Sequence, residues 1–326
     1  MKVLAEGQQM VSERILIAGG AGFIGSNLCD YYVNKKVFVV CVDNLSTGSL
    51  KNINHLINSE YFRFVEHDIC KILPKEYADL SYEAVINLAS PASPPQYQKL
   101  AIETLMVGSI GTLNLLELAK RHQSRYLQAS TSEVYGDPEE HPQPESYRGS
   151  VNCYGPRSMY DEAKRFGEAL VYVYRQKYQL STAVARFFNT YGPRMDPKDG
   201  RVVSNFIVQA LQKQPLTVYG KGQQTRSFCY IDDLIAGIVK LIESGEEGPM
   251  NLGNPSEFTI LELADLVQEL TNSHVGIVYK KLPKDDPLQR RPVIDLAKDR
   301  LGWEPKIKLR DGLIKTINHF KKEIIV

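Results

Sequence analysis

Short apolar runs alternate with segments of helical spacing through the first 190 or so residues of the chain. The apolar runs lie at 14–18, 37–42, 62–65, 84–88, 126–129 and 182–187, and the segments of helical spacing lie at 23–32, 102–120 and 160–178. Apolar runs of four to eight residues are typical of strands buried on both faces, and their alternation with helices indicates a parallel sheet covered on both sides. We therefore predict an α/β protein with a doubly wound parallel sheet.

After about residue 188 this pattern loosens, and glycine and proline separate shorter elements, as at Gly192-Pro193 and Gly220-Lys221-Gly222. Such punctuation marks turns and loops. We predict one domain over residues 12–188, to which later segments at about 228–258 return, and a smaller carboxy-terminal lobe that occupies most of 189–326.

The composition excludes several classes of protein. The 326 residues are 43% hydrophobic and 24% charged, with a net charge of +1, so no overall field attracts nucleic acid or an anionic membrane. The five cysteines are scattered without a C-x-x-C pair, and the six histidines have no ligand spacing, so we expect no disulfide framework and no metal. No signal-peptide pattern and no run near 18 apolar residues is present. We expect a soluble, cytoplasmic protein.

A glycine cluster follows the first apolar run and opens the first helical segment. Gly20, Gly22 and Gly25 give G-x-G-x-x-G, and Gly19 allows a second reading as G-x-x-G-x-x-G. Between a strand and a helix, this motif brings the backbone and the helix N-terminus against the pyrophosphate of a dinucleotide. A tight turn without a ligand is the alternative. The cluster predicts a Rossmann-type fold.

Two acidic residues follow predicted strands. Asp43, 18 residues past Gly25, stands where a carboxylate hydrogen-bonds the adenosine ribose, which favours NAD over NADP. Asp68 ends the third predicted strand, where it either contacts the adenine or caps a helix.

Tyr160 and Lys164 are four residues apart on a predicted helix and therefore share one face. A free tyrosine, with a pKa of roughly 10, is a poor base, and we expect the ammonium and a positive nicotinamide ring to lower this pKa. The pair could then remove a proton from a sugar hydroxyl, although Y-x-x-x-K alone is common on exposed helices. Thr131, Ser132 and Glu133 follow the strand at 126–129 and face the same crevice, unless they only close the strand as a polar turn.

Longer stretches carry a family resemblance. They are residues 88–95, 130–138, 155–157, 188–195, 199–206, 216–220, 251–255 and 285–287. With them the chain resembles, from about Arg14 to Lys322, the extended short-chain dehydrogenase/reductase family of nucleotide-sugar enzymes, and within it the UDP-glucuronate decarboxylases, or UDP-xylose synthases.

The resemblance implies an NAD-dependent lyase. Tyr160 takes the proton of the C4 hydroxyl while NAD takes the hydride, the resulting 4-keto acid loses CO2, and the returned hydride regenerates NAD. The implied product is UDP-xylose, or a 2-substituted relative. The alternatives within the family are a nucleotide-sugar 4-epimerase and a 4,6-dehydratase, but dehydratases carry an aspartate where this chain has Ser132.

The resemblance also implies the site residues and a homodimer, which would form through the helices at 102–120 and 160–178. The catalytic residues are Thr131, Ser132, Glu133, Tyr160, Lys164 and Arg290, of which Arg290 binds the carboxylate. NAD is bound by Gly19, Gly22, Phe23, Ile24, Gly25, Asp43, Asn44, Ser46, Thr47, Gly48, Asp68, Ile69, Leu88, Ser90, Tyr160, Lys164, Thr190 and Arg201. The UDP-sugar is bound by Ser93, Asn189, Val203, Asn205, Phe206, Tyr219, Arg226 and Arg290.

One departure from the family pattern bears on the substrate. The related decarboxylases read lysine-threonine-asparagine where this chain reads Met106-Val107-Gly108. Methionine cannot donate a hydrogen bond to a carboxylate, and glycine opens space. A uronate that is bulkier at C2, such as a 2-acetamido derivative, is therefore a candidate substrate beside UDP-glucuronate.

Overall fold

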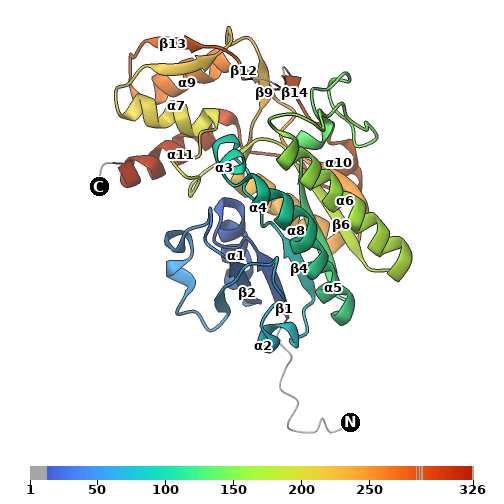
Figure 1. Cartoon of the computed structure of the whole chain (residues 1–326). Coiled ribbons are helices and arrows are strands. Elements are labelled where there is room, and N and C mark those ends of the chain that lie inside the picture. Colours follow the sequence, from blue (N-terminus) through green and yellow to red (C-terminus); the bar gives the residue numbers. More distant parts are fainter. Residues whose placement is uncertain (1–12, 284, 286, 288, 325–326) are drawn as a thin grey trace.

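A seven-stranded parallel sheet forms the centre of the protein in the computed structural model, which describes residues 13–283, 285, 287 and 289–324 (Figure 1). The strands lie in the order β11 (Pro249–Leu252), β6 (Thr182–Phe187), β5 (Arg125–Thr131), β4 (Ala84–Asn87), β1 (Arg14–Ala18), β2 (Phe38–Asp43) and β3 (Phe62–Glu66). Leu16 and Ile17 are both fully buried on opposite faces of β1, which explains why this strand is apolar throughout. The structure confirms the predicted Rossmann-type sheet.

Helices cover both faces of the sheet. On one face α1 (Phe23–Asn34) packs against α8 (Ile231–Ser244), and on the other α5 (Thr112–His122) packs against α6 (Ser158–Tyr178). Strand β11 and helix α8 lie within the stretch 228–258, for which a return to the sheet was expected. Short elements connect the layers: η1 (Leu50–Asn52), η2 (Asn54–Leu56), α2 (Lys75–Ala78), α3 (Pro94–Lys99), η4 (Ser132–Tyr135) and α10 (Asp295–Leu301).

A smaller lobe stands over the carboxyl ends of the strands (Figure 1). Helices α7 (Val202–Leu211), α9 (Ile260–Thr271) and α11 (Leu309–Ile324) pack on one another. Three small sheets accompany them: β8 (Leu216–Tyr219) with β13 (Ile277–Lys280), β9 (Thr225–Ser227) between β12 (Glu257–Thr259) and β14 (Gln289–Arg290), and β7 (Thr190–Tyr191) with β10 (Cys229–Tyr230).

One long helix runs from Ala101 to His122, through α4 (Ala101–Met106), the π-helical turn η3 (Val107–Gly111) and α5. By length and composition alone it could cross a membrane, because an 18-residue window has a mean hydropathy of 1.2. The expectation that no segment of the chain is long and apolar enough to span a membrane therefore does not hold for this helix. Only 33% of the window is buried, so this helix is apolar both toward the protein and on its outer face.

The long helix lies close against α6 at Gly108. A Cβ atom on Gly108 would lie 2.6 Å from the Cβ of Ala163 and 3.0 Å from its carbonyl oxygen. The glycine in the Met106-Val107-Gly108 departure is therefore required by the alanine opposite, which directly precedes Lys164.

We predict that Gly108→Ala lowers the free energy of unfolding by about 1–3 kcal/mol through overpacking. In an Ala163→Gly background the same change should cost less, because the 2.6 Å contact with the Ala163 Cβ is gone and the carbonyl contact at 3.0 Å remains, while alanine is the better helix former by about 1 kcal/mol. Urea unfolding of the four variants measures both effects. Gly276→Ala is the matched control, since its Cβ would meet no atom within 4 Å. Equal effects of Gly108→Ala in the two backgrounds would contradict the close contact.

Candidate active site

A cavity of about 670 Å³ lies between the carboxyl ends of the strands and the smaller lobe. The β1–α1 turn contributes Gly19, Gly22 and Gly25, and β9 contributes Arg226 from the opposite side. Ligand clefts of open α/β proteins occur at this edge of the sheet, because the loops that follow the strands gather there.

The glycine turn fits a dinucleotide. Gly19 has a φ of +76°, and a Cβ there would lie 2.7 Å from the backbone nitrogen of Ala89. Gly22 is the N-cap of α1 and has no side-chain hydrogen bond, so the first backbone N–H groups of α1 are available to a phosphate. Most residues expected to bind NAD line the cavity: Gly19, Gly22, Phe23, Ile24, Gly25, Thr47, Gly48, Leu88, Ser90, Tyr160, Lys164, Thr190 and Arg201.

Asp43, at the end of β2, contacts the backbone of this glycine turn. Its carboxylate accepts hydrogen bonds from the backbone N–H groups of Ala21 at 3.0 Å and Leu45 at 2.8 Å. Burial raises the pKa of Asp43, and these two bonds offset part of the rise. Asp43 therefore shapes the loop that would meet the adenosine ribose.

Five residues expected to bind NAD lie outside the cavity wall: Asp43 itself, Asn44, Ser46, Asp68 and Ile69. Asp68 accepts a hydrogen bond from the backbone of Cys70 at 2.9 Å, and Ile69 is buried against Gly111.

Tyr160 and Lys164 lie side by side on α6 and both line the cavity. The Lys164 ammonium donates to the carbonyl of Ala129 at 3.0 Å and lies 5.7 Å from the centre of the Tyr160 ring. Burial lowers the pKa of Lys164 to about 8. The lysine is thus fixed against the end of β5, beside the ring of Tyr160.

The ionisation of Tyr160 differs from the expectation. Burial raises the pKa of Tyr160 to about 12, and its hydrogen bond with Thr131 offsets only part of this rise. Arg201 also lowers the pKa of Tyr160, whereas Glu133 and Asp161 raise it further. In the protein alone Tyr160 is a neutral phenol, so any lowering of its pKa depends on the positive charge of the cofactor.

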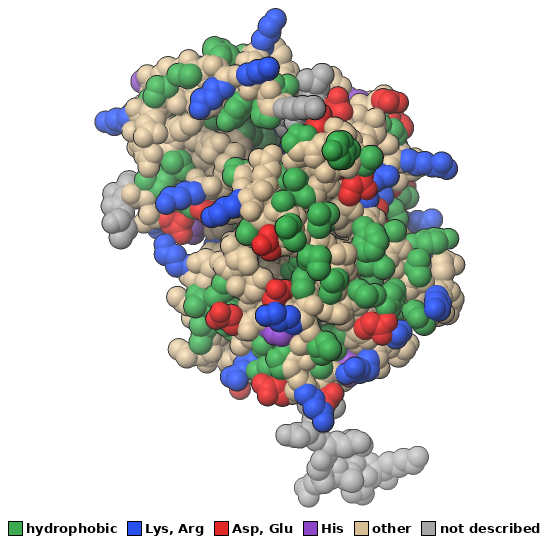
Figure 2. All heavy atoms as spheres, viewed as in Figure 1, with side chains coloured by type: hydrophobic (Ala, Val, Ile, Leu, Met, Phe, Trp, Pro, Cys, Tyr) green, Lys and Arg blue, Asp and Glu red, His purple; other side chains and the backbone are tan. Residues whose placement is uncertain are grey.

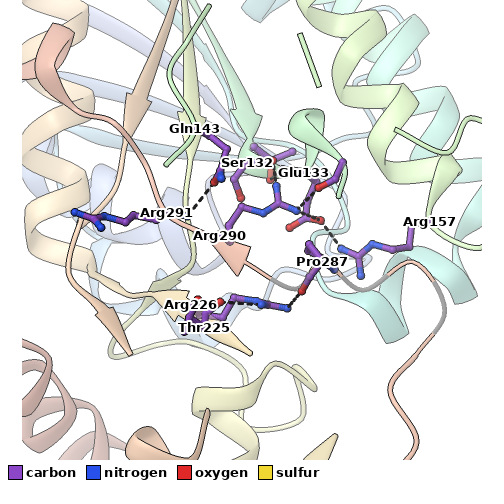
Figure 3. A network of polar contacts seen from close by, with 11 residues as sticks. Ser132, Glu133, Gln143, Arg157, Thr225, Arg226, Pro287, Arg290 and Arg291 are labelled. Atoms are coloured by element: carbon purple, nitrogen blue, oxygen red, sulfur yellow. Dashed lines mark hydrogen bonds and ion pairs between the residues drawn. The ribbon is translucent and has the colours of Figure 1, made fainter. Parts of the chain in front are cut away.

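The carboxylate of Glu133 forms ion pairs with two arginines (Figure 3). Arg157 pairs with its carboxylate at 2.5 Å and Arg290 at 3.4 Å. Burial opposes ionisation, but the two arginines outweigh it and lower the pKa of Glu133 to about 2. Glu133 is therefore an ionised acceptor next to Ser132 and Thr131.

Arg290, expected to bind the substrate carboxylate, lies behind the 132–136 turn rather than on the cavity wall. It is 1% exposed, and it donates to the carbonyl of Ser132 and, at 2.9 Å, to the carbonyl of Gly136 (Figure 3). In this position Arg290 fixes the turn and the charge of Glu133.

The residues expected to bind the UDP-sugar are divided between the cavity and the core. Ser93, Asn189, Asn205, Tyr219 and Arg226 line the cavity, whereas Val203 and Phe206 are buried in the core cluster of the smaller lobe. Val203 and Phe206 belong to the inward face of α7, which carries Asn205.

Two cavity residues were not singled out from the sequence. Tyr97 stacks on the ring of Tyr160, with centroids 5.0 Å apart, and Arg157 lies 5.9 Å above the Tyr97 ring. The hydroxyls of Tyr97 and Ser93 are buried and have no hydrogen-bond partner among the described residues. Two such hydroxyls at one wall indicate a polar ligand group, because burying them unpaired is costly.

This fold and site define a class: Rossmann enzymes that move a proton and a hydride at a hydroxyl-bearing carbon. Residues 15–253 match the NAD dependent epimerase/dehydratase family, and the chain belongs to that family.

Individual proteins to which the chain is similar have narrower activities in their names than the family does. The chain is 50% identical over 312 residues to UDP-glucuronic acid decarboxylase 1 of Xenopus tropicalis, covering 96% of this chain and 73% of the relative. It is 51% identical over 301 residues to UDP-glucuronic acid decarboxylase 3 of Arabidopsis thaliana, covering 92% and 86%. The structure resembles UDP-glucuronic acid 4-epimerase from Bacillus cereus in complex with UDP-glucuronic acid and NAD, with a TM-score of 0.85, 29% identity and coverage of 95% and 99%.

We predict that the protein binds NAD more tightly than NADP, because a carboxylate at Asp43 repels a 2′-phosphate. Asp43→Asn should narrow the ratio of the two dissociation constants, measured by calorimetry. Asp79→Asn, an exposed carboxylate far from the glycine turn, should leave the ratio unchanged. Equal affinity of the parent protein for both dinucleotides would show that Asp43 does not face the ribose.

Proposed function

We propose that the protein is an NAD-dependent UDP-uronate decarboxylase that converts UDP-glucuronate, or a 2-substituted relative, to the corresponding UDP-pentose. The observation that carries the proposal is the identity of about 50% with UDP-glucuronic acid decarboxylases over 96% of the chain, since the fold alone is also similar to that of a 4-epimerase. The free cysteines support a reducing compartment, and we propose the cytoplasm.

The cavity suits an anionic substrate and a dinucleotide together. Among the described residues, it is lined by more basic than acidic side chains: Lys51, Arg157, Lys164, Arg194, Arg201 and Arg226 against Glu133, Asp196, Asp199 and Glu323. Guanidinium groups bind phosphates and carboxylates through paired N–H groups. The excess of cations supports a ligand with several negative charges.

Three residues of the site have separate roles in moving the proton of the C4 hydroxyl. NAD, when bound, supplies a hydride acceptor and later returns the hydride to the sugar. Tyr160 accepts the proton of the C4 hydroxyl, Thr131 holds that phenol by a hydrogen bond, and Lys164 stabilises the phenolate. General bases of this kind contribute about 10²–10⁴-fold to the rate.

Oxidation at C4 makes a 4-keto uronic acid. In this β-keto acid the bond between C5 and C6 can break, because the carbonyl accepts its electron pair as CO2 leaves. The residue that precedes Glu133 is Ser132, which offers no carboxylic acid to protonate a departing C6 hydroxyl. This supports decarboxylation over dehydration.

Two features bear on the choice of uronate. Met106 is 39% exposed and lies outside the cavity wall. A lysine at this position, as in the related decarboxylases, would therefore lie on the outer side of α4 and not in the cavity. Arg157, Tyr97 and Ser93 are therefore the better candidates for contacts with the carboxylate. UDP-glucuronate and its 2-acetamido analogue are both consistent with these contacts.

The direct test is incubation with UDP-glucuronate and with its 2-acetamido analogue, followed by measurement of CO2 and of the nucleotide sugar. We expect stoichiometric CO2 and a UDP-pentose from at least one of them. A product of unchanged mass with inverted C4 would support the 4-epimerase, which the solved relatives keep as the second candidate.

We predict that Tyr160→Phe lowers kcat by about 10²–10⁴-fold and leaves the dissociation constant of NAD nearly unchanged, because only the proton acceptor is lost. Tyr172→Phe is the matched control, since Tyr172 lies on the same helix and is exposed. Retention of more than about a tenth of the parent activity would mean that another group is the base.

We also propose a homodimer formed through the outer face of the long helix and α6. Figure 2 shows hydrophobic side chains gathered where α4, α5 and α6 lie. The exposed apolar residues are Ile102, Leu105, Met106, Ile110 and Leu113 on the long helix and Phe166, Tyr172, Val173 and Tyr178 on α6. A continuous patch of this kind is typical of a protein–protein interface.

We predict that Ile102→Glu converts the dimer to monomers, because it places a charge in the apolar interface. Ile72→Glu is the control, since Ile72 is 87% exposed, compared with 73% for Ile102, and lies outside the patch. Light scattering at micromolar concentration measures the mass. A parent protein that is already a monomer would defeat the proposal.

A further inference from the structure

A second cavity of about 330 Å³ lies behind the catalytic turn. It is lined by Ser150, Asn152, Asp161 and Asp285, among other residues. Glu133, Arg157, Pro283 and Pro287 line both this cavity and the main one, so they form the boundary between the two. Among the residues that the structure describes, the Glu133–Arg157 pair and these two prolines therefore separate the second cavity from the active site.

Asp161 is the unusual residue of the second cavity. It directly follows Tyr160 on α6 and is 6% exposed, and its Oδ1 atom is buried without a hydrogen-bond partner among the described residues. An ionised carboxylate in this position would be costly. Burial, and then repulsion by Glu133, raise the pKa of Asp161 to about 7, so Asp161 holds a proton near neutral pH.

The proposed reaction needs such a proton. When CO2 leaves, the electron pair of the C5–C6 bond remains as an enolate, and C5 must gain a proton from elsewhere. Tyr160 returns to C4 the proton that it took there, so it supplies none. Glu133 holds no proton because its pKa lies at about 2. One proton therefore enters from solvent in each turnover, while substrate and cofactor fill the main cavity.

We propose that the second cavity is the entry path for this proton and that Asp161 is the residue that holds it. The inference rests on the proposed decarboxylase function. The O–H bond of Asp161 breaks and the Glu133 carboxylate takes the proton. The enolate electron pair then forms the new C5–H bond with it, and Glu133 returns to its ionised state. A proton from bulk solvent, passed along water in the second cavity, then restores the acid form of Asp161 and leaves no hydroxide in the cavity.

Several charged and titratable groups surround Asp161 and contribute to its ionisation. On α6 these are Tyr160 and Glu162, with Arg157 directly before the helix. From other elements they are Glu133 after β5, Arg290 on β14 and Tyr97 on α3. Asp137 and Asp285 line the same cavity. Acidic groups outnumber the two arginines, and both arginines already pair with Glu133, so the carboxyl of Asp161 keeps its proton.

The test follows a single turnover of UDP-glucuronate through the absorbance of reduced nicotinamide, which rises on oxidation and falls when the hydride returns. In Asp161→Asn the rise should stay within about twofold of the parent rate, whereas the fall should slow by at least about tenfold at pH 7. In the parent the fall should slow as the pH rises above 7, and in Asp161→Asn this dependence should vanish. Asp161→Glu keeps an acid and should recover most of the rate.

Two measurements separate this role from a structural one. Infrared titration of the parent should show a protonated carboxyl band that disappears near pH 7 and is absent in Asp161→Asn. At pH 8 Asp161→Asn should melt no lower than the parent, because a carboxyl with a raised pKa costs stability once it ionises. Asp79→Asn, which changes an exposed carboxylate outside both cavities, should change neither the rise nor the fall.

Equal slowing of the rise and the fall in Asp161→Asn, an unchanged fall, or an Asp161→Glu variant as slow as Asp161→Asn would overturn the inference. A parent protein that releases no CO2 from any UDP-uronate would instead overturn the proposed function. The two failures are therefore distinct.

Discussion

The pairing of Glu133 with two arginines is the interaction on which the active site depends. A carboxylate this buried would be costly if it were unpaired, and removing one partner of such a group is strongly destabilising. Arg157 comes from the start of α6 and Arg290 from β14 of the smaller lobe, so one carboxylate connects three distant parts of the chain. The same contacts fix the turn that follows β5, because Arg290 also donates to the carbonyls of Ser132 and Gly136. The position of Thr131 beside Tyr160 follows from this turn.

A second ion pair supports the turn from below. Arg186 of β6 forms two hydrogen bonds with Glu168 of α6, at 2.9 and 2.7 Å, and a third with the hydroxyl of Tyr135 at 3.0 Å. The turn is thereby held between α6, the sheet and the smaller lobe. A rigid setting of this kind is what proton transfer requires, since the reacting groups must stay within hydrogen-bonding distance. It also separates the two cavities, because Glu133 cannot move without breaking both of its ion pairs.

The sequence predicted those elements of the structure that depend only on neighbouring residues. The strands, the glycine turn, the helix from Tyr160 and the hydroxyl turn after β5 can all be read from short windows, because their periodicity and turn chemistry are encoded within a few residues. The position of Arg290 behind the turn could not be predicted from the sequence, since its partners lie more than 150 residues away in the chain. Tyr97 gave no signal, because only the folded structure shows that its hydroxyl is buried without a partner. For a related reason the sequence could not show the state of Tyr160 in the protein alone: it shows the neighbouring lysine but not the depth of burial, which raises the pKa of Tyr160.

The central claim is that the site oxidises C4, releases CO2 and protonates C5 before the hydride returns. The pattern of deuterium in the product tests this most directly. Turnover of UDP-glucuronate in D2O, read by NMR and mass spectrometry, should give a UDP-pentose with one deuterium at C5 and none at C4. The C4 hydrogen returns from the cofactor and never exchanges with solvent, whereas the C5 proton comes from solvent. A product that keeps its carboxylate, or one that carries solvent deuterium at C4, would contradict the account.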